Sequence, residues 1–132
     1  MEAERRDGPT PIAPDVAARE AAVLSKAVTR TAEFLGLSSA ELARTIGLSE
    51  ASVSRLRSGR YELTPGTKPF ELAVLLVRLY RGLDSLMGDD QASRSWLRAR
   101  NLALEGRPLD MIQSVTGLVH VIQYLDSRRA RV

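Results

Sequence analysis

The chain has 132 residues, of which 44% are hydrophobic and 5% aromatic, and its formal net charge is +3 at pH 7. This length and composition predict one domain, or two small ones that share a core, and argue against a disordered chain or a platform for base stacking. The lack of cysteine excludes disulfides, cysteine-ligated zinc and thiol nucleophiles, and with no apolar run behind the N-terminal arginines we expect a cytoplasmic protein without a signal peptide.

The N-terminal part predicts a tail followed by a long amphipathic helix. Residues 1–14 contain three prolines and charges of both signs, which favours a flexible tail. A helix over residues 15–35 follows, with Asp15 as its N-cap and Gly36 as its C-terminal cap. Its apolar stripe recurs at steps of three and four residues: Ala17, Ala21, Leu24, Val28, Thr31 and Leu35.

The next segment, LSSAELARTIGLSEASVSRLRSG, has the pattern of a helix-turn-helix. Ser38 and Glu41 form a capping box for a first helix over residues 39–46, and Gly47 supplies the positive φ that a sharp turn requires. Ser49 is the expected N-cap of a second helix, which runs to residue 58. The small Ala43 allows close approach, and these apolar side chains would hold the two helices together: Leu42, Ile46, Leu48, Val53 and Leu56.

Two further helices are expected beyond a loop with two prolines. Residues 69–87 are apolar on most of their circumference, which predicts a helix buried on several sides or shared with another chain. The longest apolar run in this segment, LAVLLVRLY, is too short to span a bilayer. After a turn at MGDDQAS, we expect a helix from residue 93 to about residue 104 that contains Trp96, with Glu105 and Gly106 closing it.

The last part of the chain completes an all-α prediction. Pro108 suits the first turn of one more helix, and the basic segment SRRARV ends the final one. That final helix has one apolar face: Leu118, Val121, Ile122 and Leu125. We therefore predict a helix-turn-helix domain at residues 15–68 and a second helical domain at residues 69–132.

The second helix of the helix-turn-helix has the composition of a DNA-reading helix, because residues 53–61 contain three arginines and no acid. Val53 and Leu56 would turn inward and leave Glu50, Ala51, Ser54, Arg55 and Arg57 pointing outward. In a major groove, the expected base-facing side chains are Glu50, Ala51, Ser54 and Arg55, of which Arg55 is best placed to bind guanine. The expected phosphate contacts are Arg57 and Arg60, with Ser49 and Ser52 at the helix start. The competing interpretation is an ordinary helical hairpin with a solvated polar face.

The chain resembles the Xre/ParS-type antitoxins of bacterial RES–Xre toxin–antitoxin pairs. The residues that carry the resemblance are SSAELARTIGLSEASVSRLRSG in the first domain, and SWLRARNLALEGRPLDMI and GLVHVIQYLDSRR in the second. The helix-turn-helix part is shared with many repressors, whereas the second pattern is far more specific. One departure is leucine directly after proline in GRPLD, where many relatives have a second small residue or a proline.

The resemblance implies an antitoxin that forms dimers through its C-terminal half, binds its own promoter and inhibits a RES-domain toxin that degrades NAD. In the family, the C-terminal helix end covers the toxin's pocket. By that resemblance, the expected toxin-contacting residues are Tyr124, Arg128, Arg129 and Arg131, with the terminal carboxylate of Val132 as an alternative plug.

An alternative function is a stand-alone transcriptional regulator whose C-terminal third only dimerises or senses a ligand. An enzyme is the least favoured class, because the sequence has no nucleophile–base pair, no metal-binding cluster and no glycine-rich phosphate loop. His120, the only histidine, has no second ligand with which to share a metal and is expected at the surface. No cofactor is expected.

Overall fold

The computed structural model describes residues 14–130, and this part of the chain folds into seven helices without a strand. The helices are α1 (Pro14–Leu35), α2 (Ser39–Ile46), α3 (Glu50–Arg57), α4 (Lys68–Met87), α5 (Asp90–Arg98), α6 (Pro108–Met111) and α7 (Val115–Ala130). The all-α prediction is confirmed. The tail predicted at residues 1–14 lies outside the described residues except for Pro14, which begins α1 one residue before the expected cap, Asp15.

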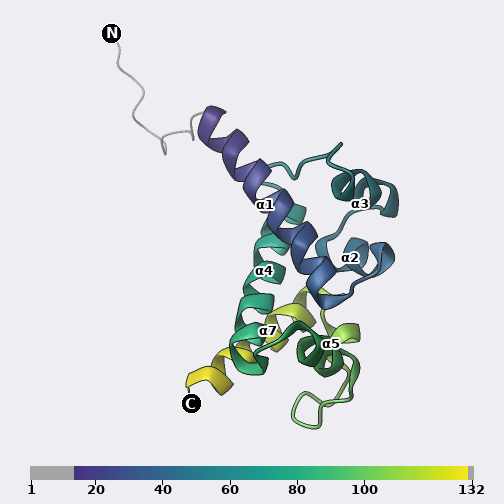
Figure 1. The fold of residues 1–132 in the computed structure, drawn as a ribbon, viewed down its shortest axis with the longest axis vertical. Helices are drawn as coiled ribbons and strands as arrows, with labels where there is room; N and C mark the ends of the chain where they lie inside the picture. Colours follow the sequence, from purple (N-terminus) through teal and green to yellow (C-terminus); the bar gives the residue numbers. More distant parts are fainter. Residues whose placement is uncertain (1–13, 131–132) are drawn as a thin grey trace.

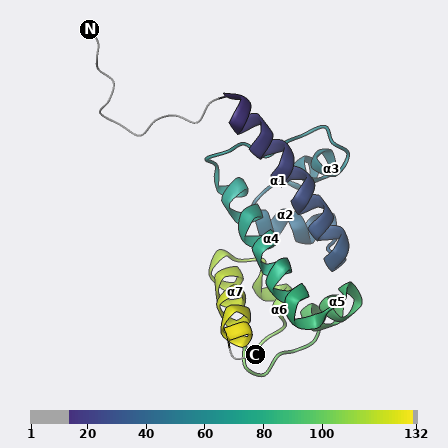
Figure 2. The ribbon, with the colours of Figure 1, turned by 60° about the vertical axis from the view of Figure 1, so that its left-hand side comes forward.

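Helix α4 is the centre of the fold and packs against α1, α2, α5 and α7 (Figure 1). Figure 2 shows α7 alongside the lower half of α4, whereas α2 and α3 lie in the upper half of the molecule. The prediction that this helix is buried on several sides is therefore confirmed. Its buried side chains join the inward faces of the other helices in one continuous hydrophobic core.

Local sequence signals fixed several helix ends as expected. Ser38 and Glu41 form both hydrogen bonds of the capping box, and Pro108 occupies the first turn of α6. The expected inward face of the last helix, from Leu118 to Leu125, is buried, and His120 is exposed. The helix starts at Ser38 and Pro108 depend on contacts within three or four residues of the chain, so the sequence is enough to predict them.

The prediction of a helix from residue 93 to about residue 104 is wrong at both ends. Helix α5 begins at Asp90 because the Asp89 carboxylate accepts a hydrogen bond from the Ala92 amide at 2.7 Å, so Asp89 is the N-cap. The helix ends at Arg98, and residues 101–106 form a tight loop instead. There, the Asn101 side chain accepts a hydrogen bond from the Leu104 amide at 2.9 Å, and local bonds of this kind compete with a helix.

A close approach of α6 and α7 occurs at Gly117, in the first turn of α7. A Cβ atom at this position would lie 2.0 Å from the backbone oxygen of Met111. The Ser114 hydroxyl accepts a hydrogen bond from the Gly117 amide at 3.1 Å, so the junction is held at the distance that only glycine tolerates.

We expect Gly117→Ala to lower the free energy of unfolding by about 1–3 kcal/mol, because the added methyl group must displace the Met111 backbone. Urea unfolding followed by circular dichroism measures this change. Thr116→Ala, at the exposed neighbouring position, serves as the control and should leave stability nearly unchanged. Wild-type stability of Gly117→Ala would show that the two helices do not approach as closely as described.

Candidate DNA-binding and toxin-binding sites

The turn between α2 and α3 depends on Gly47, which has a φ of +76°. The amides of Gly47 and Leu48 both donate to the Ala43 carbonyl oxygen, at 2.9 and 3.0 Å, and this closes the C-terminal end of α2. Ala43 is buried where the helices meet. The small residue and the glycine therefore have the roles that the sequence predicts for a helix-turn-helix.

Helix α3 is packed against the hydrophobic core along one face and has an N-cap at its start. Val53 and Leu56 are buried in the hydrophobic core, as expected. The Ser49 hydroxyl accepts a hydrogen bond from the Ser52 amide at 3.1 Å, which makes Ser49 the N-cap. The helix consequently has one defined outward face.

Most of the expected DNA-contacting residues lie on that outward face. The exposed ones are Ser49, Glu50, Ala51, Ser54, Arg55 and Arg60, and Ser52 is half-buried. Arg55 donates to the Ser52 hydroxyl at 3.2 Å, which leaves its remaining guanidinium N–H groups directed to solvent. Arg60 follows the C-terminal turn of α3, and its amide donates to the Arg55 carbonyl oxygen at 2.8 Å. This arrangement can present an arginine fork to base edges and a second cation to the phosphate backbone.

The expectation that Arg57 points outward is wrong. Its side chain is half-buried, and Nη2 donates a hydrogen bond of 2.8 Å to the Leu37 carbonyl oxygen, just beyond the end of α1. Its Nε is buried without a partner among the described residues. Arg57 therefore attaches α3 to α1, a contact across twenty residues of sequence that periodicity in α3 alone cannot reveal.

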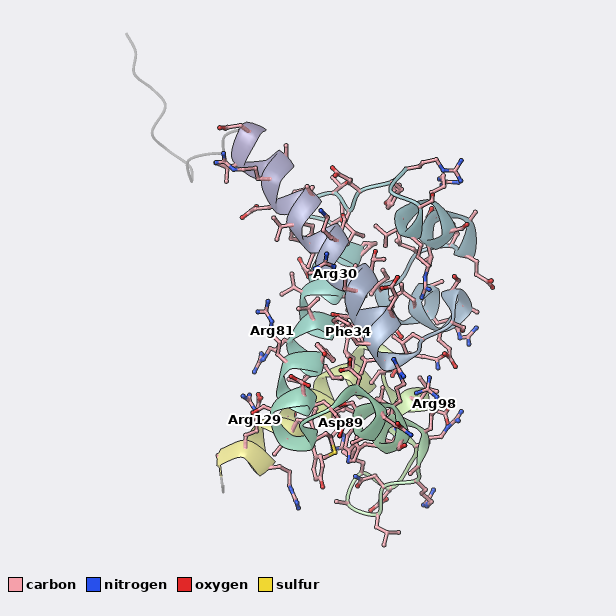
Figure 3. The ribbon with its side chains drawn as sticks, viewed as in Figure 1. Arg30, Phe34, Arg81, Asp89, Arg98 and Arg129 are labelled. Atoms are coloured by element: carbon pink, nitrogen blue, oxygen red, sulfur yellow. The ribbon has the colours of Figure 1, made fainter. Side chains whose placement is uncertain are left out.

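Two arginines of α5 bind the C-terminal end of α1. Arg94 donates to the Phe34 carbonyl oxygen at 2.7 Å, and Arg98 donates to the carbonyl oxygens of Leu35 at 3.0 Å and Gly36 at 2.7 Å. Figure 3 shows Arg98 beside this end of α1. The last carbonyl groups of a helix have no partner within the helix, so these cations satisfy them and complement the helix dipole.

The start of α5 is also attached to α4. Tyr80 donates a hydrogen bond of 2.8 Å to Asp90, and its ring stacks on Phe34 of α1 with 5.3 Å between ring centres. Burial, followed by this hydrogen bond and the negative charges of Asp84 and Asp90, raises the pKa of Tyr80 to about 12. The phenol therefore stays neutral and keeps donating at physiological pH.

The expected toxin-contacting residues of α7 lie in different surroundings. Tyr124 is half-buried and stacks on Trp96 with 6.4 Å between ring centres. Arg128 and Arg129 are both exposed, and Arg129 is also paired with Asp126 at 2.7 Å. Arg131 and Val132 lie outside the described residues.

Asp126 joins α7 to α4, because it also pairs with Arg78 at 2.6 Å. The hydrogen bond from Arg129, aided by the charge of Arg78, holds the pKa of Asp126 below its usual value, although partial burial opposes the shift. The carboxylate is therefore ionised at neutral pH and partly neutralises both arginines.

The loop at residues 101–106 is a feature that sequence reasoning missed. Asn101 and Gly106 exchange backbone hydrogen bonds of 2.8 and 3.2 Å, and Leu104 is buried beneath them. Leu102 at the tip is 84% exposed. The segment NLALEG therefore holds the paired ends of the loop, Asn101 and Gly106, and the exposed Leu102 at its tip. The sequence prediction of a helix over these residues did not distinguish their roles.

Within residues 14–130, no cluster of three or more His, Asp or Glu side chains could hold a metal ion. None of the helices in this range is long and apolar enough to cross a membrane.

The fold and the outward arginines define a helix-turn-helix protein with an additional helical domain. Two family models match it: the antitoxin Xre-like helix-turn-helix domain at residues 15–78, and the antitoxin Xre/MbcA/ParS C-terminal toxin-binding domain at residues 82–131. The chain belongs to the Xre/ParS-type antitoxins, and domains of these kinds bind DNA and a toxin rather than catalyse reactions. No curated protein sequence matches the chain. The boundary expected between residues 68 and 69 stays a prediction, since α4 reaches into both matched ranges.

We expect Arg55→Ala to weaken binding to the protein's own promoter by about 1–3 kcal/mol, because a bidentate contact to guanine is lost. Fluorescence anisotropy with the promoter duplex and a random duplex of equal length measures the effect. The loss should fall mainly on the promoter duplex. An equal loss on both duplexes would make Arg55 a phosphate contact.

We expect Arg57→Ala to act on stability instead. Loss of its hydrogen bond to Leu37 should lower the free energy of unfolding by about 1 kcal/mol, with the salt dependence of DNA binding unchanged. Arg60→Ala is the matched control: its stability should match the wild type, while the slope of log affinity against log salt falls by about 1. A reduced slope for Arg57→Ala would return this residue to the phosphate contacts.

Proposed function

We propose that this antitoxin neutralises a RES-domain toxin that degrades NAD, and that it represses its own operon through α3. The observation that carries the proposal is the presence, in one chain, of a helix-turn-helix domain with outward arginines and a toxin-binding domain that ends in basic residues. The RES identity of the toxin rests on the resemblance carried by residues 95–129.

For the DNA, we propose direct readout by Glu50, Ala51, Ser54 and Arg55, with Arg60, Ser49 and Ser52 on the phosphates. Exposure of Arg55 and Arg60 and the rigid seat of α3 support this assignment. We further propose that the antitoxin acts in the cytoplasm. We propose that it is a homodimer, because two copies of α3 about 34 Å apart could read two half-sites one helical turn apart.

For the toxin, we propose contacts from Tyr124, Arg128, Arg129, Arg131 and Val132, so that the end of α7 covers the NAD-degrading pocket. Arginines suit such a pocket wherever it presents carboxylates, because a guanidinium binds a carboxylate through two parallel hydrogen bonds. The exposed Arg128 in the last turn of α7 is available for this role.

The two activities would use separate surfaces. Figures 1 and 2 both place α3 and the end of α7 at opposite ends of the molecule. A protein bound at the end of α7 therefore leaves α3 accessible to DNA, and each activity can be removed without the other.

We expect deletion of residues 127–132 to abolish protection against the toxin while promoter affinity stays within about twofold of the wild type, because α3 is distant from the deleted segment. The test co-expresses the antitoxin with its RES-domain partner and measures cellular NAD and growth. Arg55→Ala is the reciprocal control and should retain protection. A shorter deletion of residues 131–132 separates the last two residues from Arg128 and Arg129.

Two results would contradict this assignment at different levels. Full protection by the protein without residues 127–132 would remove the plug while leaving an antitoxin. Failure of the full-length chain to bind the RES-domain protein or preserve NAD would overturn the choice of toxin.

A further inference from the structure

The loop at residues 101–106 carries the most exposed large apolar side chain of residues 14–130. Leu102 at its tip is 84% exposed, and the neighbouring Ala103 is exposed as well. A loop tip that only had to remain in water would be served equally well by polar residues. Covering this leucine with another molecule would remove its apolar surface from water, which is favourable.

The framework of the loop holds the tip in a fixed position. Asn101 and Gly106 exchange backbone hydrogen bonds across the base of the loop, and Leu104 anchors it in the hydrophobic core. Glu105 has a φ of +59°, a conformation that residues other than glycine rarely adopt. Because the backbone is already ordered, little conformational entropy is lost when a partner binds the tip.

The loop also lies close to residues that we propose for the toxin. Trp96 of α5 stacks on Tyr124 of α7, and both side chains are half-buried. Leu102 follows Trp96 in the same segment of chain, which can separate the two by about 20 Å at most. Figure 1 shows the chain that follows α5, which includes this loop, at the same lower end of the molecule as the end of α7.

One partner is large enough to cover both places. An interface of ordinary size takes about 800 Å² from each protein, which is a patch about 30 Å across. A protein that covers Tyr124 can therefore reach Leu102 without an unusually large interface. Half-exposed aromatic side chains with an apolar anchor nearby are typical of the centre of such a patch.

We infer that the 101–106 loop is a further contact with the toxin, in which Leu102 enters an apolar pocket on the toxin's surface. The matched toxin-binding range, residues 82–131, contains Leu102 together with Trp96 and Tyr124. The inference rests on the proposed antitoxin function and extends the toxin contact beyond α7.

The second copy of the proposed homodimer has another surface available to it. A groove of about 850 Å³ lies between α1 and α4, and its apolar lining includes Val23 and Val74, which are 68% and 45% exposed. Both residues lie within residues 15–78, the range of the helix-turn-helix domain. A homodimer can therefore form without covering the 101–106 loop.

Substitutions at Leu102 test the apolar contact. Leu102→Ala should weaken binding of the RES-domain toxin about tenfold or more in titration calorimetry, because the burial of a leucine side chain is lost. Leu102→Met is the matched control: it keeps an apolar side chain of similar volume and should bind within about twofold of the wild type. Since position 102 is exposed, both variants should unfold in urea like the wild type.

Chemical protection shows whether the toxin covers the loop itself. The chain has no cysteine, so Leu102→Cys places a single thiol at the tip, and Ala51→Cys places one on α3, at the opposite end of the molecule. Alkylation by a maleimide is followed by mass spectrometry, with and without saturating RES-domain toxin. We expect the toxin to slow alkylation of Leu102→Cys by about tenfold or more, because a filled pocket excludes solvent, and to leave Ala51→Cys unchanged.

The outcomes separate this inference from the antitoxin function. If the wild type binds the toxin while Leu102→Ala binds equally well or Leu102→Cys stays fully reactive, the loop is not a toxin contact and the antitoxin function stands. If rising antitoxin concentration alone protects Leu102→Cys, the occupant is a second copy and the inference is overturned. If the wild type does not bind the RES-domain protein, the choice of toxin fails, and the inference that rests on it fails as well.

Discussion

The carbonyl groups at the C-terminal end of α1 are the point on which both halves of this antitoxin depend. Arg94 and Arg98 reach them from α5, and Arg57 reaches the adjoining Leu37 from α3. All three arginines are twenty or more residues away in sequence from the carbonyl groups that they bind. They donate to backbone oxygens that would otherwise lack partners. The recognition helix and the toxin-binding domain are thus attached to the same helix end.

Helix α4 reinforces this connection because it belongs to both domains. The matched ranges end at residue 78 and begin again at residue 82, and both positions lie within α4. No linker separates the domains, and one hydrophobic core runs through both. A partner bound to the second domain therefore contacts a body that is continuous with α3, even though the two proposed surfaces are far apart.

The sequence predicted features that depend on near neighbours in the chain. The capping box at Ser38, the glycine turn at Gly47 and the buried face of α7 are of this kind. It could not predict the role of Arg57, because the deciding partner is twenty residues away, or the groove, which forms only when α1 meets α4. The misplaced α5 had a different cause: the side chains of Asp89 and Asn101 bind nearby amides and override the apolar period.

The arginines at the end of α1 also restrict how this protein can be recombined with its relatives. A chimera that joins this helix-turn-helix domain to another antitoxin's second domain keeps α1 but loses Arg94 and Arg98 unless the donor supplies equivalents. The Phe34, Leu35 and Gly36 oxygens would then face the new junction without their cations. Compatibility between grafted halves is therefore decided at this junction before either ligand is involved.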